Sequence, residues 1–136
     1  MKVLAISAAC VVVLSGALAA GPQPTTGQAM AGQGDFHQYC AACHGDSAKG
    51  DGPIASSLRR HPANLTELAR RNDGTFPADQ VFRIIDGSKP VPGHGGPDMP
   101  EWGDVFGKSA ASTNADAVKT RIDAIVKYLE SIQVKP

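Results

Sequence analysis

Two cysteines and a histidine form the group of residues with the clearest chemical potential in this sequence. Cys40, Cys43 and His44 stand in the order C-x-x-C-H. At this spacing two thiols and an imidazole can bind a metal ion, form a redox-active disulfide, or attach a c-type haem. In the haem case both thiols bond the porphyrin and the imidazole ligates the iron. The residues around the motif therefore indicate which of these three interpretations is favoured.

The zinc and disulfide interpretations lack the surroundings that they need. A structural zinc site requires four protein ligands, yet His37, His61 and His94 are widely scattered and no other cysteine remains once the first 19 residues are removed. A thiol–disulfide oxidoreductase places its C-x-x-C at the start of a helix that follows a strand, where the helix end stabilises the thiolate. Here the motif closes a predicted helix, so covalent haem is the favoured interpretation.

A haem that only carries electrons needs a second axial ligand, and Met99 is the first candidate. It lies between Pro97 and Pro100, on no apolar stripe, and a proline-framed loop can present a thioether at a fixed position. His94 is the competing ligand and would give a bis-histidine haem of lower potential. The residues alone leave both open.

The elements that must position these residues are predicted to be helices. We expect a first helix over Met30–Cys43, a short one over Asn64–Asn72, and a third that begins at Pro77 and stops at Gly87. Residues 88–103 should form an irregular loop, because four prolines and four glycines fall there. No segment has the alternation typical of strands.

The last predicted helix has the clearest pattern. Its apolar residues recur at spacings of three and four, with Thr113 or Asn114 as the cap, and the stripe consists of Val118, Ile122, Ile125, Leu129 and Ile132.

The first twenty residues have the features of an export signal. Met1-Lys2 precedes an uncharged apolar run, Val3 to Ala20, that ends in Ala17-Leu18-Ala19. We expect a cleaved signal peptide over residues 1–19, a flexible leader over 20–29 and a monohaem domain over 30–136, and hence a periplasmic protein. The alternative is an uncleaved segment that anchors the protein in a membrane.

Composition limits the possible functions further. The 136 residues carry 13 basic and 13 acidic side chains, which gives no support to nucleic-acid binding. The chain has 15 glycines and 10 prolines but only 4 phenylalanines, 2 tyrosines and 1 tryptophan. So small a domain is short of bulky groups for its core, and a haem would supply what is missing.

Taken together, these features resemble a class I c-type cytochrome, of the small monohaem type found in the bacterial periplasm. Gly32 and Phe36 match the glycine and aromatic residue that precede the first haem cysteine in that family, and Tyr128-Leu129 match its C-terminal helix contact. The resemblance implies an all-α fold in which N- and C-terminal helices cross around one covalent haem c. It also implies that the carbonyl of Pro53 accepts a hydrogen bond from the axial histidine, and that Trp102 packs at the haem edge.

The function implied is one-electron transfer by a carrier that is not an enzyme, with His44 and Met99 as axial ligands. Its partners would be redox proteins, namely a dehydrogenase, an oxidase or a respiratory complex, and it would meet a membrane only transiently or through such a complex. The alternatives are a haem c gas sensor or weak peroxidase with a labile sixth ligand and, less favoured, a thiol–disulfide redox protein.

We expect the haem pocket to be lined by Leu58, Leu65, Leu68, Phe82, Ile85 and Ile125. A basic group that could steer an acidic partner comprises Arg59, Arg60, Arg70, Arg71, Arg83 and Lys89.

Overall fold

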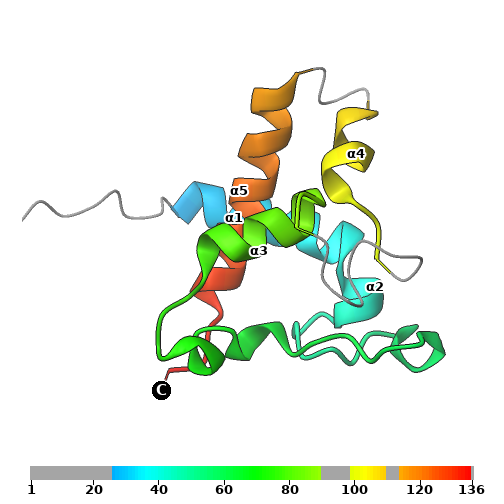
Figure 1. Ribbon diagram of the computed structural model, residues 1–136, viewed down its shortest axis with the longest axis vertical. Helices are drawn as coiled ribbons and strands as arrows, with labels where there is room; N and C mark the ends of the chain where they lie inside the picture. The colour runs from blue at the N-terminus through cyan, green and yellow to red at the C-terminus, as the bar shows by residue number, and fades with distance from the viewer. Residues whose placement is uncertain (1–25, 90–98, 110–113, 136) are drawn as a thin grey trace, which may run out of the picture.

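The computed structural model describes residues 26–89, 99–109 and 114–135, and these residues form helices without any strand. The α-helices are α1 (Thr26–Tyr39), α2 (Ala41–His44), α3 (Ala78–Asp86), α4 (Trp102–Gly107) and α5 (Ala115–Ser131) (Figure 1). Three short 3-10 helices, η1 (Ala55–Ser57), η2 (Leu65–Glu67) and η3 (Arg70–Asn72), lie between α2 and α3. The prediction of an all-α fold is confirmed.

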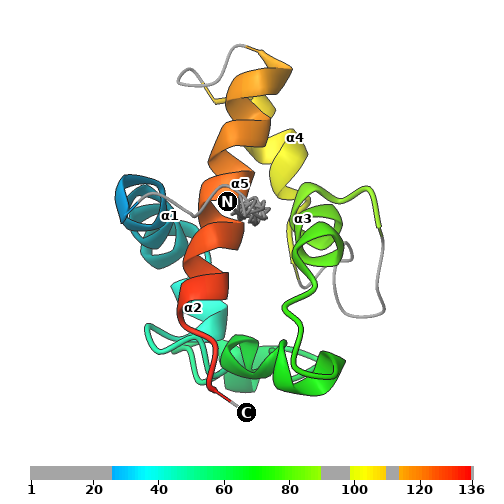
Figure 2. The same ribbon diagram turned by 90° about the vertical axis from the view of Figure 1, so that its left-hand side faces the viewer.

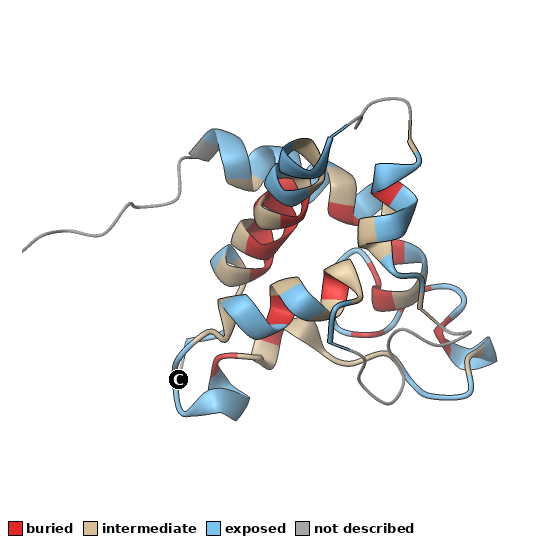
Figure 3. Cartoon of the chain, turned by 45° about the horizontal axis from the view of Figure 1, so that its top comes forward, coloured by how far each residue is buried: buried red, intermediate tan, exposed pale blue. Residues whose placement is uncertain are grey.

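Helix α5 is the centre of the molecule. It lies between α1 on one side and α3 and α4 on the other, and it contacts all three (Figure 2). Its buried positions cover a broad arc of the helix, toward the neighbours on both sides (Figure 3). Ile122, Ile125 and Leu129 are at most 3% exposed, as the apolar spacing predicted, and Val118 and Ile132 pack against the same core. The side chain of Asn114 caps the helix by accepting a hydrogen bond from the amide of Ala117.

Helices α1 and α5 cross where the sequence places a glycine. A Cβ atom at Gly32 would overlap the backbone carbonyl of Ala124 and lie 2.9 Å from the amide nitrogen of Ile125. Phe36, fully buried, lies one turn further along α1, and its ring centroid is 5.3 Å from that of Tyr128. The two helices therefore approach at backbone contact, with an aromatic pair beside the crossing.

The first predicted helix is divided in the structure. It begins at Thr26 instead of Met30, and it is interrupted at Cys40, where φ is −114° and departs from helical geometry. The backbone hydrogen bonds nevertheless continue through the break, from Cys40 to Phe36 and from His44 to Cys40. Cys40 and His44 thus remain on the same side of nearly continuous helical structure.

The segment predicted as a helix over Asn64–Asn72 consists of the two 3-10 turns η2 and η3. Asn64 caps it as expected, by accepting from the backbone amide and the hydroxyl of Thr66. Length alone does not exclude an α-helix here, because α3 also has nine residues. Tertiary contacts hold the two turns: Gln133, just beyond α5, donates from Nε2 to the carbonyl of Leu65 and accepts from the amide of Ala69.

Helix α3 matches its prediction, whereas α4 was not predicted. Pro77 precedes the first residue of α3, and Gly87 ends it with φ of +90°, a conformation that glycine adopts without strain. Helix α4 begins inside the stretch that we expected to be irregular. Its six residues include two glycines, so local propensity is poor, and the burial of Phe106 against α5 stabilises it.

Among the described residues, none of the helices combines the length and apolar composition that crossing a membrane requires.

Candidate haem site

The motif C-x-x-C-H places two thiols and an imidazole around helix α2. Cys40 immediately precedes this helix, while Cys43 and His44 form its last residues. Both cysteines are free thiols and half-buried, and His44 is only 6% exposed. A single helical turn therefore presents all three groups.

An apolar cavity lies directly beside this turn. It encloses about 100 Å³, and the space reaches about 570 Å³ when its mouth, which opens to solvent, is included. Cys40 and His44 line it, and Met99 contributes a thioether from the segment before α4. Apolar side chains from four other parts of the chain complete the wall: Phe36, Ala63, Leu65, Leu68, Val81, Ile84, Ile85, Ile125 and Leu129.

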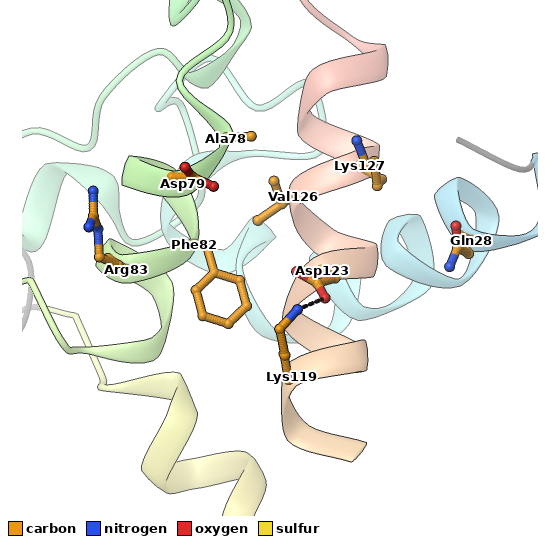
Figure 4. Close-up of a pocket in the computed structure, with 9 residues that line it drawn as sticks. All are labelled: Gln28, Ala78, Asp79, Phe82, Arg83, Lys119, Asp123, Val126 and Lys127. Atoms are coloured by element: carbon orange, nitrogen blue, oxygen red, sulfur yellow. Dashed lines mark hydrogen bonds and ion pairs between the residues drawn. The ribbon is translucent and has the colours of Figure 1, made fainter. Parts of the chain in front are cut away.

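Four of the six predicted pocket residues line this cavity, namely Leu65, Leu68, Ile85 and Ile125. Phe82 does not. Because successive residues of a helix are rotated by about 100°, Val81 and Ile85 face the cavity and Phe82 points into a groove between α3 and α5 (Figure 4). Leu58, at the end of η1, is half-buried but is likewise not one of the lining residues.

The imidazole of His44 is held by the backbone. Its Nδ1 lies 3.4 Å from the carbonyl oxygen of Ala63, which can accept only from a protonated Nδ1. Donation from Nδ1 selects the tautomer whose Nε2 carries the lone pair, and this is the form that ligates a metal.

The turn at Gly52-Pro53 lies against helix α2. The amide of Gly52 donates to the carbonyl of Cys43, and the amide of Ile54 donates to that of Ala42. A Cβ atom at Gly52 would lie 2.6 Å from the carbonyl oxygen of Cys43, so this close approach requires glycine. Pro53 itself is exposed. Its role as the acceptor for His44 stays a prediction beside the hydrogen bond to Ala63.

Met99 is half-buried and lies three residues before α4. The cavity thus brings together a thioether and an imidazole that are 55 positions apart in the numbering. His94, the competing candidate, falls outside the described residues.

The two thiols are poorly suited to thiol–disulfide exchange. Burial, together with the nearby charges of Asp35 and Cys43, raises the pKa of Cys40 to about 12, and burial also raises the pKa of Cys43. The thiolate is the nucleophile in disulfide exchange, so raised pKa values disfavour that chemistry. In the part of the chain that the structure describes, no three His, Cys, Asp or Glu side chains group as ligands for a metal ion.

Trp102 lies in an aromatic cluster next to the cavity and is not one of its lining residues. Its ring centroid is 5.5 Å from that of Tyr39 and 5.4 Å from that of Phe106. Its predicted place at the haem edge remains a prediction.

The sequence analysis did not identify two groups that support the site. One is the ion pair of Arg121 with Asp35, and the other is Gln133 with its contacts to η2. Arg121 lies beside the apolar stripe of α5 and Gln133 follows its last residue, but the partner of each is more than 60 positions away along the chain.

All residues of the predicted basic group are exposed, and two of them are in ion pairs. Arg70 and Arg71 both pair with Glu67.

The donor set fits a covalently bound haem. Two thiols, an imidazole and a thioether surround or adjoin an apolar cavity, and these are the groups that c-type cytochromes use to attach and ligate their haem.

Comparison with known proteins agrees with the chemistry of this donor set. No curated protein and no solved structure matches the chain. Residues 27–129 match the family described as cytochrome C oxidase, cbb3-type, subunit III. This match runs from the second residue of α1 to Leu129 in α5, and it includes the C-x-x-C-H motif and Met99. The chain therefore belongs to this family of c-type cytochrome domains, which bind haem c covalently and transfer electrons through it.

Proposed function

We propose that this protein is a periplasmic one-electron carrier, with one haem attached through Cys40 and Cys43 and ligated by His44 and Met99. The observation that carries the proposal is that Cys40, His44 and Met99 line the same apolar cavity. Cys43 adjoins it on the same helical turn.

Each residue would have a distinct task. The two cysteines would fix the haem in the chain, and the hydrogen bond from His44 to Ala63 would orient the imidazole toward it. Bound haem supplies the change of oxidation state. The thioether of Met99 and the apolar wall would both favour the reduced form and thereby raise the potential. With His44 and Met99 both as ligands, a bound haem would have no position open for a substrate, which would favour a carrier over an enzyme.

We further infer that residues 1–19 are a signal peptide, that 20–29 are a leader and that 30–136 form the haem domain. The support is the basic start, the apolar run and the small residues around Ala17-Leu18-Ala19. Retention of this segment as a membrane anchor is the alternative.

The partners would be other redox proteins. The matching family is described as a subunit of an oxidase, so an oxidase complex is the acceptor that we propose to test first. A carrier that diffuses freely between a dehydrogenase and such a complex would use the same haem site as a subunit of the complex.

The proposal is tested on protein made together with periplasmic haem-attachment machinery. A pyridine haemochrome assay should report covalent haem, and the ferric protein should show the weak far-red band of His/Met ligation. Met99→Ala should abolish this band and allow rapid carbon monoxide binding by the ferrous form. His94→Ala is the matched control and should retain the band.

Two results would overturn the proposal. A Met99→Ala variant that keeps the band would exclude Met99 as the ligand. Rapid carbon monoxide binding by the wild-type protein would favour the gas sensor or weak peroxidase instead.

A further inference from the structure

An ion pair between helices α1 and α5 has the geometry of a fixed structural support. Arg121 donates from Nε to Oδ2 of Asp35 at 2.8 Å and from Nη2 to Oδ1 at 2.6 Å. The two side chains are only 20% and 19% exposed. A bidentate pair fixes the plane of the guanidinium as well as its position.

The guanidinium held in this way lies over two aromatic rings. Its Cζ atom is 4.2 Å from the ring centroid of Phe106 and 4.8 Å from that of Tyr39. Phe106 is 1% exposed and belongs to α4, whereas Tyr39 is the residue before Cys40. Together with Trp102 these rings form a cluster whose centroids are 5.3 to 5.5 Å apart. Arg121 thus connects α4 to both α1 and α5.

The opposite side of α4 is held by α3. A Cβ atom at Gly103 would lie 2.6 Å from the carbonyl oxygen of Asp86, and one at Gly87 would lie 2.8 Å from the side chain of Glu101. Helix α4 is therefore seated between the end of α3 and the aromatic cluster. Both contacts at the end of α3 are close approaches to a glycine, and on its other side α4 packs through Phe106 and Trp102.

Met99 is tied to the position of α4 by a short stretch of chain. Three residues of chain span at most about 10 Å, and Met99 is three residues before Trp102. A shift of α4 would consequently move the thioether relative to His44.

We propose that Arg121 is a positioning residue for the sixth ligand. Paired with Asp35 and stacked on Phe106, it holds α4 in the place that keeps Met99 opposite His44. This inference rests on the proposed axial ligation by His44 and Met99. Arg121 does not line the cavity; it acts only through α4.

The experiment is a titration of the ferric holoprotein with imidazole, and loss of the far-red band measures how much imidazole is bound. Arg121→Lys keeps the charge but loses the bidentate geometry and the flat stacking surface. We expect it to bind imidazole about tenfold more tightly than the wild-type protein, a difference of about 1.4 kcal/mol, because an ammonium neither forms the bidentate pair with Asp35 nor stacks flat on Phe106. Asp35→Asn leaves the side-chain shape nearly unchanged and should give a smaller change, about threefold.

Lys127→Gln is the matched control. Lys127 is also a basic residue of α5 in an ion pair, but its partner, Glu130, is on the same helix. This variant should bind imidazole as the wild-type protein does.

The outcomes separate this inference from the proposed function. A wild-type holoprotein without the far-red band refutes the axial ligation and this inference with it. A wild-type protein with the band, and variants that unfold more easily yet bind imidazole with unchanged affinity, would limit Arg121 to joining α1 and α5 and refute only its positioning role. If Arg121→Lys yields no holoprotein, Asp35→Asn decides alone by the same comparison.

Discussion

Replacing Gly32 with alanine should destabilise the protein, whereas the same replacement at Gly34 should stabilise it. Both glycines lie inside α1, so alanine improves the local helix propensity by about 1 kcal/mol at either position. Their surroundings differ. A Cβ atom at Gly34 has no atom within 4 Å, but one at Gly32 would overlap the backbone of Ala124 on α5.

The magnitude follows from what can move at the crossing. The atoms that the new methyl group would meet are backbone carbonyl and amide atoms, so no change of rotamer can relieve the overlap and the helices must separate. Overpacking of this kind costs about 1–3 kcal/mol, and we take the upper end because Phe36 and Ile125 beside the crossing also lose contact. After the gain in propensity, Gly32→Ala should lower the free energy of unfolding by about 2 kcal/mol.

The assay is urea unfolding of the two holoproteins, monitored by far-ultraviolet circular dichroism. The variants should differ by about 3 kcal/mol, since Gly34→Ala gains about 1 kcal/mol. With a slope of about 2 kcal/mol/M, their midpoints should be about 1.5 M apart. Equal midpoints would show that α1 and α5 do not approach at Gly32 as the structure has them, and the reasoning would fail.

Two further predictions concern η2 and the side chains that hold it in place, Gln133 and Glu67. Gln133→Leu should lower the free energy of unfolding by about 2 kcal/mol, because it leaves the carbonyl of Leu65 and the amide of Ala69 without their partner; urea unfolding measures this, and a loss below about 0.5 kcal/mol would contradict it. Hydrogen bonds from Arg71 are the main cause that lowers the pKa of Glu67 below its ordinary value of 4.5. The ionised side chain therefore stabilises the folded protein above its unfolded pKa, and this contribution is lost as the pH falls through the folded pKa. Glu67→Gln should accordingly be less stable than the wild-type protein at pH 7, and unfolding measured in a series of acid buffers should show the difference disappear; a difference that persists in acid would refute the assignment.

The parts of the fold that could be predicted are those that depend on residues close together in the sequence. The stripe of α5 follows from spacing alone, because an α-helix repeats every 3.6 residues and one side must be buried. The ends of α3 follow from Pro77 and Gly87, whose backbone preferences act on their own position. The turn that holds Cys40, Cys43 and His44 is equally local.

Other parts depend on contacts that no local pattern encodes. Helix α4 has weak propensity and exists through the burial of Phe106. Phe82 is rotated by about 100° from Val81 on α3, and the placement of α5 makes the side that it faces a groove instead of the cavity. For His44 the hydrogen-bond acceptor described is Ala63, on a segment whose path the sequence did not define.

By itself the sequence identified the candidate groups for the chemistry, two thiols and an imidazole on one turn, and the amphipathic helices that can surround a haem. Their spacing is set by bonds along the chain, so it is visible without a structure. Only the tertiary structure decided which thioether shares a cavity with His44, and that Arg121 reaches Asp35 across 86 positions to hold α4. Contacts between such distant residues depend on how whole helices pack, and packing is a property of the folded chain.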